Sequence, residues 1–157
     1  MKSAGPGIRC SSIHACAILL GENGVLIRGP SGSGKSALAL ALVEDWTRDG
    51  AFARLIADDR VILARRGNSL IARLNSCIAG LIEVRSLGIV ALDFEQAAVV
   101  RLVIDLVSDV PDRLPDADSR NVTMIGVKIP VLRVHQRESH DRLAQIIRIA
   151  LRHESND

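Results

Sequence analysis

Residues 29–36 impose a specific local structure on this chain. They are Gly-Pro-Ser-Gly-Ser-Gly-Lys-Ser and fit the pattern G-x-x-x-x-G-K-[ST] at every fixed position. The glycines let successive backbone N–H groups point into one concavity without a clash from a Cβ atom. A helix that starts directly after the last glycine turns the positive end of its dipole toward the same concavity. The pattern therefore predicts a phosphate-binding loop between a strand and a helix.

Each position of such a loop has its own task. The backbone N–H groups cradle the phosphates, the lysine ammonium lies on the β- and γ-phosphates, and the serine hydroxyl binds Mg²⁺. We expect ATP and Mg²⁺ as ligands, with Lys35 as a catalytic cation and Ser36 as a metal ligand. The expected nucleotide-binding residues are Gly29, Pro30, Ser31, Gly32, Ser33, Gly34, Lys35, Ser36 and Ala37.

The composition argues against several other classes of partner. Aromatic residues make up 2% of the 157 residues, too few for stacking single-stranded nucleic acid. The net charge of +2 predicts no broad surface for polyanions, so we expect no nucleic acid partner. No apolar run approaches the ~18 residues that a membrane span needs, and we expect no membrane contact. Three cysteines without metal-binding spacing are typical of a reduced, cytoplasmic protein.

The apolar patterning predicts an α/β fold with a mixed sheet. The length suits one domain, which we expect to span residues 1–157. The chain segments 12–19 and 25–28 predict a hairpin of two strands just before the loop. Further strands are expected at 54–57, 61–64, 69–74, 82–85 and 98–107, with irregular strands over 121–134. Helices are expected at 36–48 and 139–153, a loop at 108–118 and a polar tail at 154–157.

A phosphate loop needs acidic partners to complete a reaction site, and three candidates compete. Asp58 and Asp59 end a predicted strand, where one carboxylate could face the metal and the other a substrate hydroxyl. They could equally form an exposed turn before the next strand. Asp105 follows an apolar strand, as the metal-directing acid of many such enzymes does, or it is simply an outward strand residue. Glu83 resembles an ordinary surface acid by its pattern alone.

Beyond this loop, the order of several segments resembles a known family. His14 lies 21 residues before Lys35, and Leu-Ile-Ala-Asp-Asp at 55–59 is similar to the family's ADD segment. Residues 81–90, Leu-Ile-Glu-Val-Arg-Ser-Leu-Gly-Ile-Val, are similar to its LEIRGLGII signature. Asp-Arg-Leu at 112–114 and the stretch 125–130 match further segments in the same order. The chain resembles the catalytic domain of HPr kinase/phosphorylase, in a short form without the N-terminal domain.

The resemblance implies a fold and a reaction. It implies the α/β phosphate-loop fold of the HPr kinase catalytic domain, which is similar to that of PEP carboxykinase. The implied activity is ATP-dependent phosphorylation of a serine of the phosphocarrier protein HPr, with the reverse dephosphorylation, in regulating a phosphotransferase system. HPr is then the protein partner, and the family forms homo-oligomers that are hexamers. Two alternatives are a phosphate-loop kinase of small metabolites and a non-catalytic ATP-binding regulatory module.

The resemblance also implies residue roles. It makes Ser36 and Glu83 the metal-associated residues, and makes one of Asp58 and Asp59 the base that deprotonates the substrate serine. Which of the two is the base stays open. His14, Lys35 and Arg113 would stabilise charge on the transferred phosphoryl group or orient the acid. Arg113 could instead pair with a nearby aspartate of its own loop, and His14 could be a polar residue at a strand edge.

Some positions depart from the family's pattern. Ser86 and Ala15 stand where the family has glycines, after the arginine of the signature and after the histidine. Residues 134–143 share little with the family's segment before its last helices. Kinase chemistry requires only the residues that the chain retains.

Overall fold

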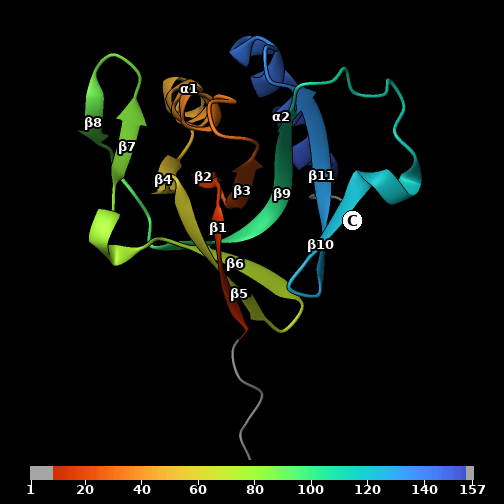
Figure 1. The fold of residues 1–157 in the computed structure, drawn as a ribbon, viewed down its shortest axis with the longest axis horizontal. Coiled ribbons are helices and arrows are strands. Elements are labelled where there is room, and N and C mark those ends of the chain that lie inside the picture. Colours follow the sequence, from red (N-terminus) through yellow and green to blue (C-terminus); the bar gives the residue numbers. More distant parts are fainter. Residues whose placement is uncertain (1–8, 155–157) are drawn as a thin grey trace, which may run out of the picture.

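A strongly curled sheet and two helices on one of its faces form the body of the protein. The structure, a computed structural model, describes residues 9–154. One sheet has the strand order β1-β5-β6-β9-β3-β2-β4, with β11 added beside β9 and β10 beside β11, and a separate two-stranded sheet is made by β7 and β8. Figure 1 shows the helices above the sheet, the β5–β6 hairpin below, and the β7–β8 hairpin projecting to one side. The α/β class with a mixed sheet is confirmed.

The strands, in chain order, are β1 (Cys10–His14), β2 (Cys16–Leu20), β3 (Asn23–Arg28), β4 (Ala53–Ala57), β5 (Arg60–Arg66), β6 (Ser69–Arg73), β7 (Leu81–Val84), β8 (Gly88–Ala91), β9 (Ala97–Val107), β10 (Asn121–Met124) and β11 (Val127–His135). The helices are α1 (Lys35–Arg48) and α2 (His140–Glu154), with short 3₁₀ turns η1 (Ser76–Ile78) and η2 (Ala117–Arg120).

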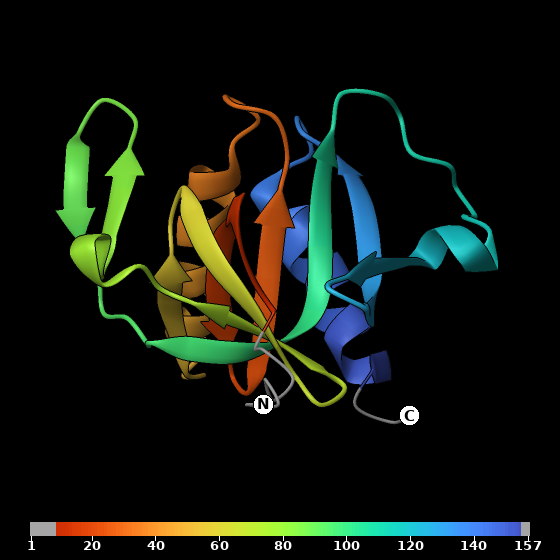
Figure 2. The same cartoon turned by 60° about the horizontal axis from the view of Figure 1, so that its bottom comes forward.

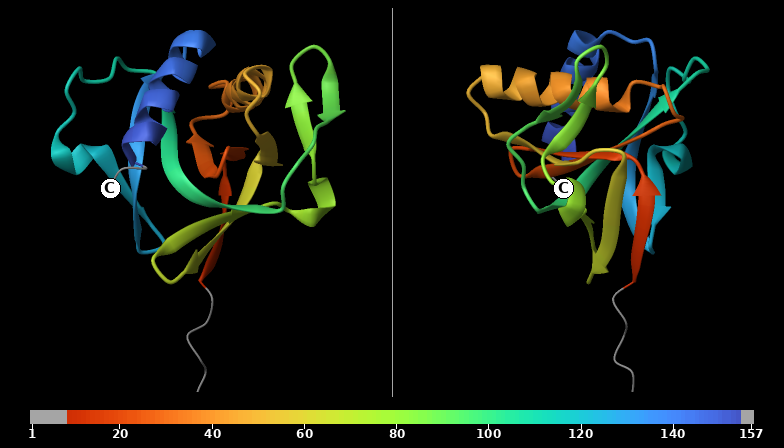
Figure 3. Two further views of the ribbon diagram at one scale, coloured as in Figure 1. Left: turned by 180° about the vertical axis from the view of Figure 1, so that it is seen from behind. Right: turned by 60° about the vertical axis from the view of Figure 1, so that its left-hand side comes forward.

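The longest strand, β9, joins the two halves of the curl. Its first residues pair antiparallel with β6, and the rest pairs parallel with β3 and, farther along, with β11. Figure 3 shows β9 bending from the lower layer of strands into the layer below the helices. Its carboxyl end therefore lies beside that of β3, where the glycine-rich segment 29–34 begins.

Strands of the central layer are buried on both faces, and their side chains alternate between two cores. From β3, Val25 and Ile27 pack toward the helices, whereas Leu26 packs into the interior of the curl. This alternation is the period of two of an extended chain, and burial on both faces explains why β3 is apolar throughout its centre. The burial fixes the register of β3, because a one-residue slip would exchange the two sets.

Helix α1 starts directly after the glycine-rich segment because Gly34 adopts a left-handed conformation, with a φ of 95°. Its buried residues recur with the helical period on the side that faces the sheet; they are Lys35, the adjacent Leu38 and Ala39, Leu42 and Trp46. Helix α2 packs beside it, and Arg148 of α2 lies over the Trp46 ring and pairs with Asp45. Both predicted helices are confirmed within one residue at each end.

Two predictions about the strands were wrong in detail. The strand expected at 12–19 is two strands that break at Ala15, whose N–H donates to the Asp59 carbonyl; β1 then pairs with β5, and β2 with β3 and β4.

The irregular strands expected at 121–134 form a regular hairpin instead. Ile125 and Gly126, both with positive φ, make its two-residue turn, and Pro130 lies where β11 leaves β10 and takes β9 as its partner. Strand β8 was not predicted.

Candidate active site

The glycine-rich segment, residues 29–34, forms an open loop between β3 and α1. Gly32 and Gly34 have φ values of 78° and 95°, and a Cβ atom on either would meet nothing within 4 Å. A side chain is therefore excluded there by backbone conformation, which glycine alone adopts at little cost. Lys35 is only 8% exposed, and its Nζ donates to the carbonyls of Gly29 and Pro30 at 2.9 and 3.0 Å. The loop thus holds its lysine bent back over its own first residues.

Asp58 joins three elements at the start of α1. The Ser36 hydroxyl donates to Asp58 Oδ1 at 2.6 Å, and the Glu83 N–H of β7 donates to Asp58 Oδ2 at 3.2 Å. Asp58 itself is 8% exposed and follows the last residue of β4. Both of its oxygens are engaged, so this carboxylate fixes the hydroxyl of Ser36 and the position of the β7–β8 hairpin.

Asp59 points the other way, because its φ of 66° places it in a left-handed conformation. Its Oδ1 lies 2.8 Å from His14 Nε2, and both side chains are accessible, 70% for Asp59 and 47% for His14. The two aspartates therefore separate at a tight turn rather than by the alternation of an extended strand. Asp58 faces the loop and the interior, and the Asp59–His14 pair faces solvent.

Cys16 is a buried neighbour of this cluster that the sequence did not single out. Burial raises the pKa of its thiol well above the ordinary value, the negative charge of Asp58 and a hydrogen bond to that carboxylate raise it further, and Lys35 opposes the shift. The thiol therefore stays protonated and supports Asp58 from the interior side. Cys16 and Asp58 come together because β2 pairs with β4. The sequence does not reveal this strand pairing.

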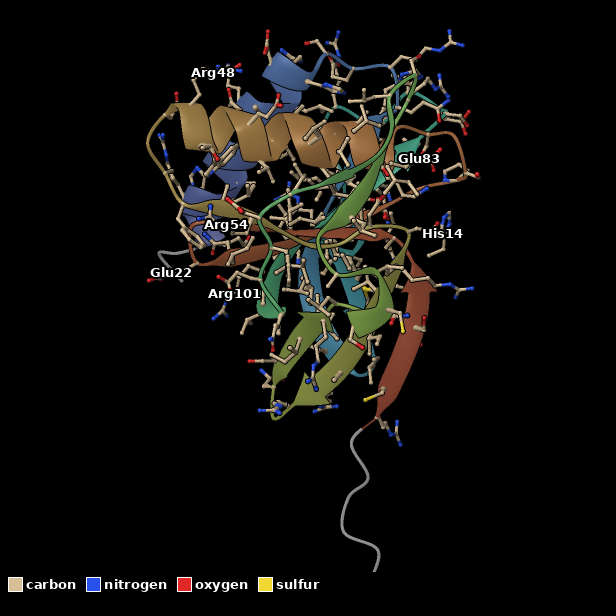
Figure 4. The ribbon with its side chains drawn as sticks, turned by 90° about the vertical axis from the view of Figure 1, so that its left-hand side faces the viewer. His14, Glu22, Arg48, Arg54, Glu83 and Arg101 are labelled. Atoms are coloured by element: carbon tan, nitrogen blue, oxygen red, sulfur yellow. The ribbon has the colours of Figure 1, made fainter. Side chains whose placement is uncertain are left out.

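Figure 4 shows where these residues lie on the molecule. His14 and Glu83 lie at the end where α1 begins, whereas Arg48, Glu22, Arg54 and Arg101 mark the opposite end. The Glu83 side chain is exposed, and its carboxylate has no hydrogen bond or ion pair with the described residues. The structure thus brings His14, Ser36, Asp58, Asp59 and Glu83 to one end of the sheet.

The residues present fit a nucleotide phosphate chain with Mg²⁺. The Ser33 hydroxyl is buried within the loop and has no hydrogen-bond partner among the described residues. Hard oxygen donors suit Mg²⁺, which is usually held by one or two protein oxygens together with substrate phosphates and water. In residues 9–154 no group of three or more His, Cys, Asp or Glu side chains could hold a metal ion by itself. A magnesium ion held by Ser36 and Glu83 would therefore need phosphate oxygens and water as its other ligands.

Two other candidate residues form no hydrogen bond or ion pair with this cluster among the described residues. Arg113 is exposed on the segment between β9 and η2 and forms no hydrogen bond or ion pair within the described part of the chain; the considered pairing with a nearby aspartate is not formed. Asp105 is held by Arg28, whose Nε and Nη2 donate to its two oxygens at 2.7 and 2.8 Å. This pairing supports the interpretation of Asp105 as a strand residue.

Comparison with known proteins places the chain in a family. The family model described as "HPr Serine kinase C-terminal domain" matches residues 9–156. The chain belongs to this family. The match spans every element described above and agrees with the resemblance noted from the sequence motifs.

Curated relatives carry the same family name. Chains called HPr kinase/phosphorylase are 33% identical over 122 residues in Chlorobium phaeobacteroides, 36% over 124 in Prosthecochloris aestuarii and 33% over 134 in Mycoplasma mycoides. These alignments cover 71%, 71% and 77% of this chain, but 34%, 34% and 41% of the relatives. The chain therefore spans about a third to two-fifths of the length of the curated relatives that it matches.

A solved structure supports the fold. The HPr(Ser) kinase/phosphatase from Coxiella burnetii matches with a TM-score of 0.74 at 25% identity, over 94% of this chain and 99% of that one. The curled sheet with helices on one face is thus the fold of an HPr kinase catalytic domain. Among the described residues, no helix is long and apolar enough to cross a membrane.

Proposed function

We propose that this member of the HPr serine kinase family transfers the γ-phosphoryl group of ATP to a serine of an HPr-type phosphocarrier protein. The observation that carries the proposal is the convergence of Ser36, Asp58 and the Glu83 N–H, next to a solvent-facing Asp59–His14 pair. The cluster at Ser36, beside the glycine-rich loop, suits a nucleotide phosphate chain. The Asp59–His14 pair suits an incoming hydroxyl group. The family match supports HPr as the acceptor and the cytoplasm as the compartment.

Asp59 is the member of the aspartate pair that we assign as the base. A protein serine is bulky, so the base must be accessible, and Asp59 is 70% exposed whereas both oxygens of Asp58 are occupied. The serine Oγ–H bond breaks and its proton passes to Asp59. The new Oγ–P bond forms while the bond between the γ-phosphorus and the bridging oxygen of ADP breaks. His14 orients Asp59 through the 2.8 Å contact.

The remaining residues bind and stabilise charge. Lys35 and the backbone N–H groups of the loop neutralise the charge on the phosphates, and bound Mg²⁺ supplies further positive charge there. Asp58 holds the Ser36 hydroxyl in place. Arg113 would reach the site from its exposed segment. The same residues serve the reverse reaction, so we propose dephosphorylation as well: the O–P bond of the phosphoserine breaks, the phosphoryl group passes to the terminal phosphate oxygen of ADP, and the protonated Asp59 returns its proton to the serine oxygen.

Mass spectrometry of a purified HPr-type carrier, incubated with this protein, ATP and Mg²⁺, tests the proposal. We expect one added phosphoryl group on one serine. Labelling of a small metabolite instead of the carrier would favour the metabolite kinase. ATP binding without transfer to any acceptor would favour the regulatory module.

Replacing Glu83 by glutamine is expected to raise the Mg²⁺ concentration needed for half-maximal transfer by about tenfold, because a neutral amide binds the cation more weakly. A titration with MgCl₂ at fixed ATP measures the shift. Glu22→Gln, which removes an exposed carboxylate at the opposite end of the molecule (Figure 4), is the matched control. A slower reaction with an unchanged Mg²⁺ midpoint would contradict the metal role of Glu83.

A further inference from the structure

Arg28 and Asp105 form an ion pair that the proposed reaction does not use. They lie opposite each other at the carboxyl ends of the parallel strands β3 and β9. The guanidinium donates from Nε and Nη2 to both carboxylate oxygens, at 2.7 and 2.8 Å. Their side chains are 29% and 17% exposed, so water screens the pair only partly. A bidentate pair of this kind fixes an orientation as well as a distance.

One residue beyond Arg28, the glycine-rich loop begins in close contact with β9. A Cβ atom on Gly29 would lie 3.0 Å from Leu106 Cβ and 3.2 Å from the Leu106 carbonyl oxygen. Such contacts leave no room for a side chain and little room for a shift of β9 along β3. Because Lys35 Nζ is held by the Gly29 and Pro30 carbonyls, the position of Gly29 also sets the position of the lysine.

On the other strand, Asp105 lies close to the root of the segment that carries Arg113. Strand β9 ends two residues later, and the exposed segment 108–118 follows. The start of this segment is hydrogen-bonded to the end of β11. Gln136 N donates to the Val107 carbonyl at 2.8 Å, and His135 Nε2 lies 3.0 Å from the Ser108 carbonyl. Figure 2 shows β3 in orange and β9 in green ending side by side, with the loop above one and the segment rising from the other.

We propose that Arg28 and Asp105 are positioning residues that set the glycine-rich loop, and through Gly29 the ammonium of Lys35, relative to the segment carrying Arg113. The inference rests on the proposed function for its ligand, ATP, but not for its geometry. The ion pair connects the start of the glycine-rich loop, which holds Lys35, with the start of segment 108–118, which carries Arg113. Neither residue touches the phosphates in this role.

A simple effect of charge and a positioning role predict opposite changes in the ATP affinity of Asp105→Asn. Asp105→Asn removes a negative charge beside the loop and frees the charge of Arg28, so a simple effect of charge would tighten ATP binding. A positioning role predicts weaker binding, by about tenfold, because the loop loses its fixed contact with β9. The exchanged pair, Arg28→Asp with Asp105→Arg, restores the ion pair and is expected to recover affinity to within about threefold of the original chain.

Two measurements on the full chain decide the matter. The first is the dissociation constant of ATP, with and without Mg²⁺, for the original chain, both single variants and the exchanged pair. The second is hydrogen–deuterium exchange without nucleotide, which we expect to rise in residues 29–34 and 108–118 of Asp105→Asn and to return in the exchanged pair. Asp45→Asn is the matched control, since it breaks a 2.8 Å pair with Arg148 of similar burial between α1 and α2; its ATP affinity should not change.

Several results would overturn the inference. Tighter or unchanged ATP binding by Asp105→Asn would do so, as would faster exchange confined to the strands β3 and β9. A loss of affinity seen only with Mg²⁺ and not recovered by the exchanged pair would make Asp105 a metal-directing acid instead. Should the original chain bind no ATP, the proposed function fails, and the exchange measurement still decides the positioning role.

Discussion

Lys35→Ala is expected to lower phosphoryl transfer by about 10³-fold while the fold persists. The Lys35 ammonium is the cation that the loop holds over its own first carbonyls, at 2.9 and 3.0 Å, and it is nearly buried. A preorganised charge in a site of this kind stabilises the negative charge of the transferred group far better than water does. The measurement is the initial rate of phosphoserine formation on the carrier protein, with circular dichroism to show that the variant is folded.

The methylene chain of Lys35 also packs at the start of α1, so a second variant separates packing from charge. Lys35→Met keeps most of the apolar stem and removes only the ammonium, and it should lose as much activity as the alanine variant. Arg48→Met, at the far end of the same helix (Figure 4), removes an exposed cation and should leave the rate unchanged. A methionine variant with nearly the original rate would remove Lys35 from the mechanism.

The structural elements predicted best from the sequence are those that depend on interactions between residues close together in the chain. The glycine-rich loop, the helix after it and the β2–β3 hairpin are encoded within about thirty residues, by turn residues and by spacing. Their interactions form locally, and so their pattern is visible without a tertiary structure. The family motifs added the order of the site segments, which composition and periodicity do not give.

Features decided by contacts distant in sequence were not predictable. The strand break at Ala15 arises because its N–H finds the carbonyl of Asp59, more than forty residues away. The pairing of Asp105 with Arg28 joins residues 77 apart, and from the sequence alone the acid had two equal interpretations. The regular turn at Ile125 was hidden because a β-branched residue rarely adopts a positive φ.

Asp58 and Asp59 show, within the site itself, the difference between what local sequence predicts and what only the structure shows. The sequence left two possibilities for Asp58 and Asp59: carboxylates that face opposite sides because side chains alternate along a strand, or an exposed turn. They do face different ways, but the cause is a turn: β4 ends at Ala57, and Arg60 N donates to the Asp58 carbonyl at 2.8 Å. The left-handed conformation of Asp59 then directs its carboxylate to His14. The assignment of separate roles needs this geometry.

Asp59→Asn is expected to lower transfer by about 10²–10⁴-fold, because an amide cannot take the proton of the incoming serine. The variant is well suited to the test, since asparagine tolerates the left-handed conformation about as readily as aspartate does. Its fold and its ATP affinity should therefore remain. Single-turnover rates on the carrier protein, together with the dissociation constant of ATP, separate the loss of a base from a loss of binding.

Asp58→Asn should behave differently, and the contrast tests the assignment of roles. The Asp58 carboxylate accepts hydrogen bonds from Ser36 and from the Glu83 N–H, so its loss should weaken binding of ATP with Mg²⁺ as well as slow transfer. Asp141→Asn, an exposed acid in the first turn of α2, controls for loss of charge. If Asp59→Asn transferred phosphate at the original rate while Asp58→Asn bound ATP normally and transferred none, the base would be Asp58. The accessible Asp59–His14 pair would then serve only to orient the acceptor.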